Sequence, residues 1–217
     1  IVFLAVLGLD ALGTVPVEFA VTWPGHAIAP SPRVVAAGLL VFAALIFSRQ
    51  TFEAHPFLLS LGAFVAFCAV SSSVYLINDV RDQAQDRLHP VKRLRPIAAG
   101  EITLRTAMIA AGALAIGGLA IGGVIGPAFF GVLALYLAIM VGYNAGLKHV
   151  VILDVILIAL GFVLRAAGGA IAIDVPISPW LYLCTFVVSL LVGFGKRRHE
   201  LLLLQDGAVG HRQNLET

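Results

Sequence analysis

The sequence predicts an all-α integral membrane protein, and two features of its composition lead to that prediction. Of its 217 residues, 60% are hydrophobic and only 12% are charged, about half the charged fraction (~25%) of an ordinary soluble domain. The charges are also clustered, with nine in residues 78–101 and seven in residues 196–217. This composition excludes a disordered chain and a disulfide scaffold, and a net charge of +2 gives no indication of a nucleic-acid partner.

Long apolar stretches without charge predict the membrane-spanning helices. A helix needs about 20 mostly apolar residues to cross the hydrocarbon core, where its backbone groups have no water to bind. Residues 1–33 form an N-terminal segment to which we assign no role, followed by a transmembrane domain over residues 34–217. We expect six spans in this domain, near residues 34–48, 56–77, 104–122, 125–144, 150–173 and 179–195.

The basic residues predict how these spans are oriented. With the spans in this order, twelve of the 14 Lys and Arg residues fall on one side of the membrane. Arg49 alone falls on the other side, and Arg165 lies within a span. Because loops rich in Lys and Arg stay in the cytoplasm, we expect both charge clusters at the cytoplasmic face of the plasma membrane, where they can form one site.

The first charge cluster contains three acids, Asp79, Asp82 and Asp86, in the pattern N-D-x-x-D-x-x-x-D. On a helix the three side chains fall within roughly 60° of one another. Carboxylate oxygens suit Mg²⁺, which also binds substrate phosphates, and the basic residues nearby can neutralise the remaining phosphate charge. The pattern therefore predicts a site for Mg²⁺ and a diphosphate, with a solvated loop of mixed charge as the alternative.

Three motifs, in order along the chain, resemble those of a known family. The acidic pattern followed by K-R-x-R-P-x-x-x-G is similar to the first signature loop of the UbiA superfamily of membrane prenyltransferases. DRLHPVKRLRPIAAG, YNAGLKH and GKRRHEL together resemble the decaprenyl-phosphate phosphoribosyltransferase family over residues 39–214. The superfamily fold has nine helices around a central cavity, so six spans in a chain ending at Thr217 predict a domain incomplete at its C-terminus.

The resemblance implies Mg²⁺-dependent transfer of 5-phosphoribose from phosphoribosyl diphosphate to a polyprenyl (decaprenyl) phosphate, with release of diphosphate. It implies that the catalytic acids Asp79, Asp82 and Asp86 hold Mg²⁺ on the leaving diphosphate, and that Asn78 orients a carboxylate or a phosphate. The further substrate-binding residues that it implies are Lys92, Arg93, Arg95, Tyr143, Lys148, Lys196, Arg197, Arg198 and Glu200. The family usually has an R-P-x-Q-W-x-K-N-type segment where this chain has SPRVVAAG (residues 31–38), so we expect one phosphate contact to be missing.

Two ionisable residues, Asp154 and Arg165, lie within one predicted span. They are eleven residues apart, which places them on the same face of a helix and roughly 16 Å apart along its axis. Ionisable residues within a span are candidates for function. We expect both to contact substrate, and a structural ion pair with another helix is the alternative for Arg165.

Two other functions are compatible with parts of this pattern. A prenyltransferase of the same fold would move a polyprenyl group from its diphosphate to an aromatic acceptor. A transporter or channel would use Asp154 and Arg165 as a relay, but it predicts polar residues and broken helices in several spans, and the spans near residues 56–77, 104–122 and 125–144 contain few of either. Phosphoribosyl transfer is the preferred interpretation.

Overall fold

The computed structural model describes residues 32–88 and 92–213, and the predicted N-terminal segment up to residue 31 lies outside this part of the chain. Its regular secondary structure is helical, as the composition predicts. Among the described residues, four helices are long and apolar enough to cross a membrane: α4 (Ala54–Leu88), α6 (Leu104–Ile125), α7 (Pro127–Ala145) and α8 (Val151–Ala172). They correspond to the second to fifth predicted spans.

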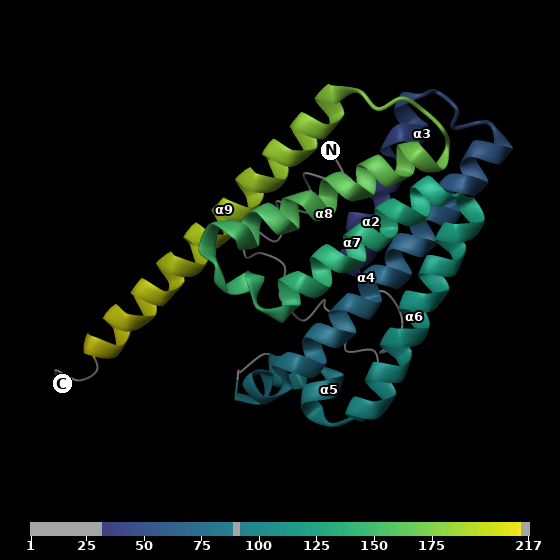
Figure 1. Cartoon of the computed structure of the whole chain (residues 1–217). Coiled ribbons are helices and arrows are strands. Elements are labelled where there is room, and N and C mark those ends of the chain that lie inside the picture. Colours follow the sequence, from purple (N-terminus) through teal and green to yellow (C-terminus); the bar gives the residue numbers. More distant parts are fainter. Residues whose placement is uncertain (1–31, 89–91, 214–217) are drawn as a thin grey trace.

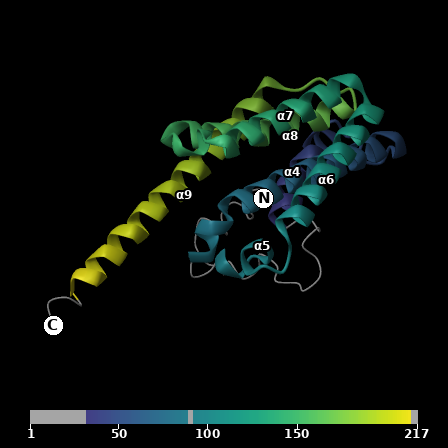
Figure 2. The ribbon, with the colours of Figure 1, turned by 60° about the horizontal axis from the view of Figure 1, so that its bottom comes forward.

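The first and last predicted spans look different in the structure. The stretch predicted near residues 34–48 is helical but broken into α2 (Pro32–Gly38), η2 (Leu39–Phe42) and α3 (Ala43–Phe47). The stretch predicted near residues 179–195 is the apolar beginning of a longer helix, α9 (Pro179–Gln213). In Figures 1 and 2, α9 runs beside α8 and its C-terminal end projects away from the other helices.

The core forms where α4, α7 and α8 meet η2. Phe67 of α4 packs edge-on against Phe129 and Tyr136 of α7, with ring centroids 5.8 and 5.5 Å apart. Gly169 of α8 lies so close to Val41 that a Cβ at residue 169 would come within 2.8 Å of the Val41 carbonyl carbon. A glycine is therefore required where α8 crosses η2, and this crossing fixes α8 beside α4.

Local sequence signals set the helix ends around the first polar loop. The loop contains η3 (Lys92–Leu94) and α5 (Pro96–Ala99), which begins with proline. The Thr103 hydroxyl accepts a hydrogen bond from the Thr106 amide (3.2 Å) and caps α6, as expected of an N-cap threonine. A second short helix, η4 (Leu147–His149), connects α7 to α8.

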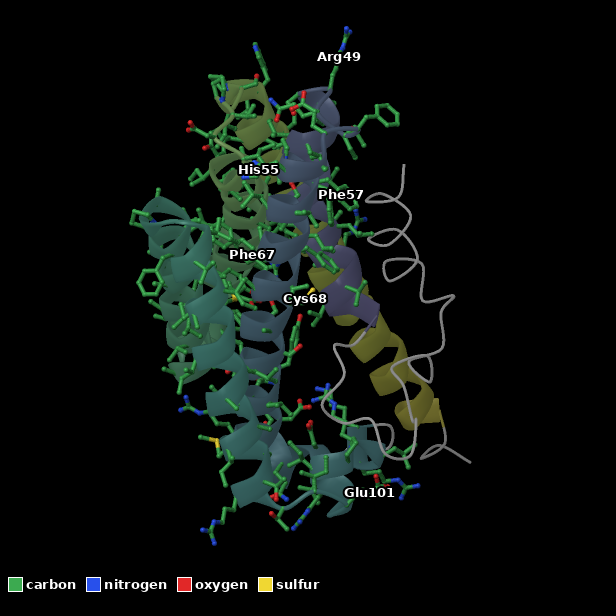
Figure 3. The ribbon with its side chains drawn as sticks, turned by 90° about the vertical axis from the view of Figure 1, so that its right-hand side faces the viewer. Arg49, His55, Phe57, Phe67, Cys68 and Glu101 are labelled. Carbon is green, nitrogen blue, oxygen red and sulfur yellow. The ribbon has the colours of Figure 1, made fainter. Side chains whose placement is uncertain are left out.

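The two ends of the bundle differ in character. Figure 3 shows Arg49 and His55 at one end, Phe67 and Cys68 about halfway along, and Glu101 at the other end, next to the first polar loop. The 35 residues of α4 make a helix about 52 Å long, which exceeds the roughly 30 Å hydrocarbon core. Its last turns therefore extend beyond the apolar part and carry the acidic pattern.

Candidate active site

The three aspartates at the end of α4 lie on one continuous helix, as their spacing predicts. Asp79 and Asp86, two turns apart, each accept a hydrogen bond from Nη1 of Arg95, at 2.8 Å in both cases. Asp82 instead accepts two hydrogen bonds from the ammonium group of Lys148. The structure thus divides the predicted acidic cluster between two cations that come from different parts of the chain.

Arg95 is positioned by the way its loop folds back onto α4. Its extended backbone (φ −64°, ψ 139°) precedes α5, and two side chains of α4 hold that short helix in place. Gln83 Nε2 donates to the carbonyl oxygen of Ile97 (2.9 Å), and Arg87 Nε donates to that of Ala98 (3.1 Å). Ile97 and Ala98 are themselves buried. The fold of this loop therefore places the Arg95 guanidinium against α4, the helix that carries the acids.

Lys148 reaches the same end of α4 from η4. Its Nζ lies 3.0 and 3.1 Å from the two carboxylate oxygens of Asp82 and 3.3 Å from the side-chain oxygen of Asn78. Gly146 precedes η4 with a φ of +151°, a conformation that favours glycine. The Y-x-x-x-x-K spacing thus places the lysine beside the N-D-x-x-D motif, about 70 residues earlier in the chain.

Two residues near the end of α7 connect it to its neighbours. The Tyr143 hydroxyl donates to the buried Asp154 carboxylate of α8 at 2.7 Å. The Asn144 amide donates to the carbonyl oxygen of Val74 in α4 at 3.3 Å. Tyr143 and Asp154, both predicted to bind substrate, are thus in direct contact with each other.

Arg165 lies deeper in the bundle and is buried between α4, α7 and α8. Its Nη2 donates to the hydroxyls of Ser71 (3.0 Å) and Tyr136 (2.6 Å), and its Nη1 donates to the carbonyl oxygen of Gly161 (3.1 Å). Its guanidinium carbon also lies 4.7 Å from the centroid of the Tyr136 ring. Among the side chains that the structure describes, no carboxylate forms an ion pair with Arg165, so the structural ion pair considered above is not seen there.

The remaining predicted residues lie at the surface or outside the described side chains. Lys92 and Arg93 are exposed on η3, and Arg198 is exposed on α9. The side chains of three α9 residues lie outside the described part of the structure: Lys196, Arg197 and Glu200. The second charge cluster is thus not brought to the acids by any described contact.

Comparison with known proteins decides the family. The sequence profile of the UbiA prenyltransferase family matches residues 35–195. The chain belongs to this family. The match confirms the resemblance seen in the signature motifs, and it covers every helix from η2 to the apolar part of α9.

Several relatives of this UbiA-family chain are curated decaprenyl-phosphate phosphoribosyltransferases. The protein from Mycolicibacterium smegmatis is 43% identical over 155 residues, which are 71% of this chain and 49% of that protein. The protein from Corynebacterium glutamicum is 38% identical over 186 residues, or 85% of this chain and 54% of that protein. The chain spans about half the length of the curated relatives it matches.

A solved structure shows the same fold. It is that of a UbiA homolog from Archaeoglobus fulgidus bound to GPP and Mg²⁺, with a TM-score of 0.60 and 21% sequence identity. The superposition covers 88% of this chain and 60% of the archaeal protein. At this identity the likeness establishes the UbiA fold alone, and the role of each site residue has to be argued from this chain.

The donor set on α4 fits a Mg²⁺ ion. In the described residues, no three His, Cys, Asp or Glu side chains gather closely enough to hold a metal ion by themselves. Mg²⁺ does not require three, because it typically takes one or two carboxylates and completes its shell with water and substrate phosphates. Asp79 and Asp86 already converge on one cationic nitrogen, and carboxylate oxygens are the hard donors that this ion prefers.

Several side chains that build the site were missed by the sequence interpretation. Gln83 and Arg87 were counted only as part of a polar loop, yet they hold the helix that follows Arg95. Ser71 and Tyr136, which contact Arg165, lie in apolar runs. For Ser71 and Tyr136, the signal that could have found them is a polar side chain within a predicted span.

Proposed function

We propose that this protein transfers 5-phosphoribose from phosphoribosyl diphosphate to a polyprenyl phosphate and releases diphosphate. The observation on which the proposal rests is the convergence of Asp79 and Asp86 on one cation, next to a second carboxylate–cation pair. Relatives named decaprenyl-phosphate phosphoribosyltransferase support this choice of substrates, at 38–43% identity. The polyprenyl chain of the acceptor fits a protein whose helices are apolar enough to lie in lipid.

In this proposal Asp79 and Asp86 hold Mg²⁺, with Asp82 beside them. The bound ion supplies positive charge that stabilises the departing diphosphate. Arg95 and Lys92 neutralise the negative phosphate charge that the metal does not neutralise. The Arg95 guanidinium can bind two phosphate oxygens at once. Asn78, held by Lys148, orients a carboxylate or a phosphate.

The acceptor needs little chemical activation. Departure of diphosphate leaves positive charge on C1 of the ribose, and a lipid phosphate is already an anionic nucleophile. The residues therefore act by positioning the two substrates and by stabilising charge, rather than by removing a proton. Tyr143 and Asp154, hydrogen-bonded to each other, contact the substrate where α7 and α8 meet.

Arg165 contacts the substrate deeper in the bundle. Its Nη atoms are engaged by neutral groups, whereas its Nε is buried and has no hydrogen-bond partner in the described part of the structure. One N–H thus stays available for a substrate oxygen. The basic residues of the second cluster, with Arg93, contact phosphates at the cytoplasmic face of the plasma membrane, and Glu200 binds the substrate beside them through its other polar groups.

The test is transfer of labelled phosphoribose into lipid by the whole protein that carries this sequence. Membranes containing it, incubated with labelled phosphoribosyl diphosphate, polyprenyl phosphate and Mg²⁺, should form a labelled lipid. Asp82→Asn should lower the rate at least ~100-fold, while Asp174→Asn should not, because Asp174 is exposed between α8 and α9. Unchanged transfer by an Asp79→Asn, Asp86→Asn double variant would show that the metal assignment is wrong.

The same membranes distinguish the two rival functions. A UbiA-type prenyltransferase would consume a polyprenyl diphosphate and an aromatic acceptor instead, and would form no phosphoribosyl lipid. A transporter would move a solute across sealed vesicles without forming any new covalent product. Absence of labelled lipid from well-expressed, folded protein would contradict phosphoribosyl transfer.

A further inference from the structure

Arg95 occupies the point at which the two carboxylates of α4 converge. Its Nη1 lies 2.8 Å from an oxygen of Asp79 and 2.8 Å from an oxygen of Asp86. The Asp86 side chain is only 4% exposed, so water contributes little to its solvation. Two carboxylates this close repel each other unless a cation lies between them. In this structure, the cation between them is the guanidinium.

The backbone around Arg95 is held independently of this ion pair. Gln83 and Arg87 bind the carbonyl oxygens of Ile97 and Ala98, so α5 is attached to α4 by contacts that do not involve the Arg95 side chain. The Arg95 side chain is itself 37% exposed. The guanidinium can therefore leave the carboxylates and turn outward without loss of the loop that carries it.

We propose that Arg95 is a substrate-binding residue that exchanges partners when the substrate binds, an inference that rests on the proposed function. Before the substrate binds, Arg95 keeps Asp79 and Asp86 together. When these acids bind Mg²⁺, Arg95 is released and pairs with the diphosphate that accompanies the metal. A guanidinium suits both partners, because its planar fork matches carboxylate and phosphate oxygens equally.

This exchange couples metal binding to diphosphate binding. Without diphosphate, a metal ion has to displace Arg95, which then has no new anionic partner. With diphosphate present, the displaced guanidinium gains one. Each ligand therefore tightens the binding of the other by the same factor, as linkage requires, and such couplings are typically about 5- to 150-fold.

Mn²⁺ binding measured by electron paramagnetic resonance tests the coupling without any turnover. The purified whole protein in detergent is titrated with Mn²⁺ with and without inorganic diphosphate, correcting for the complex that the two form in buffer. For the wild type, diphosphate should tighten Mn²⁺ binding at least ~5-fold. Arg95→Gln should bind Mn²⁺ alone more tightly than the wild type, and diphosphate should tighten it less than 2-fold.

Arg81→Gln is the matched control. It removes the same charge from the same end of α4, but Arg81 is exposed and contacts none of the acids among the described residues. It should keep the wild-type coupling. If Arg95→Gln is not monodisperse, Arg95→Lys replaces it, with a smaller change in the same direction, because an ammonium lacks the planar fork of the guanidinium.

The outcomes separate the possibilities. Weaker Mn²⁺ binding by Arg95→Gln would mean that Arg95 only supports the site, and would overturn the proposal. Equal coupling in the wild type and in Arg95→Gln would overturn it as well. Failure of phosphoribosyl transfer would leave this measurement valid, because a prenyltransferase of this fold also releases diphosphate. The two hypotheses can thus fail separately.

Discussion

Replacing Arg165 with methionine should leave the fold intact while lowering activity. The guanidinium makes three hydrogen bonds, to Ser71, Tyr136 and the Gly161 carbonyl. Hydrogen bonds between membrane helices are worth about 0.6 kcal/mol on average and at most about 1.7, so together the three give about 2–5 kcal/mol. Burying the guanidinium opposes this gain, because removing an ion from water still costs several kcal/mol after relaxation.

The hydrogen-bond gain and the desolvation cost of Arg165 are of similar size and nearly cancel. Among the described side chains, no carboxylate adds an ion pair that would offset the desolvation further. Methionine fills a similar length without a charge. The Ser71 and Tyr136 hydroxyls, 3.0 Å apart, keep each other as partners, so the substitution leaves neither of them unsatisfied. We therefore expect the free energy of unfolding to change by no more than about 1.5 kcal/mol, or a melting temperature shift within about 5 °C for a protein of this size.

The activity should respond differently. If the free Nε–H of Arg165 binds a substrate oxygen, its loss removes a hydrogen bond to a charged group, worth about 1.5–3 kcal/mol, and transfer falls about 10- to 150-fold. Thermal unfolding in detergent and the labelled transfer assay, run on the same preparation, measure both quantities. A melting temperature more than about 10 °C lower, or unchanged transfer, would refute this reasoning, since Arg165 would then be a structural link between three helices.

Two further predictions concern packing and the second cation. Gly169→Ala should lower the free energy of unfolding by about 2–3 kcal/mol, measured by thermal melting, because its Cβ would overlap the Val41 backbone. Gly112→Ala is the control and should be neutral or slightly stabilising, since an added Cβ would meet no atom within 4 Å apart from the neighbouring backbone of its own helix; an equal loss in both variants would contradict the packing argument. Lys148→Met should reduce transfer about 10- to 100-fold, because Asp82 loses its cation, and Lys148→Arg should recover part of the rate. Full activity of Lys148→Met in the transfer assay would remove Lys148 from the site.

Hydropathy predicted the long helices well because each apolar run is about as long as a bilayer is thick. It did not predict the break between α2 and α3, since that segment is shaped by what packs against it. The residues of η2 cross α8 at Gly169, where the two backbones are almost in contact. The sequence of residues 34–48 alone does not predict a contact with a residue more than 120 positions later in the chain.

The acidic motif illustrates the same limit at the site. Helical spacing correctly placed Asp79, Asp82 and Asp86 on one helix, and treated them as one group. Their separation into two pairs depends on where Arg95 and Lys148 arrive, and this is decided by a loop folding back and by a helix about 70 residues away. A periodicity argument gives the face of a helix, whereas the partner of each side chain is a property of the tertiary structure.

The polar contacts of α4 occur at two levels, and this arrangement divides the site between two tasks. Ser71 meets Arg165 in the middle of the bundle, and Asp82 meets Lys148 at its end. Ser71 and Asp82 are eleven positions apart on α4, which separates these levels by roughly 16 Å. A diphosphate held by the acids therefore cannot also reach Arg165, which has to contact a different part of the substrates. Because α4 carries both levels, a displacement of this helix would change both contacts together, whereas substitution of a single side chain should change only one.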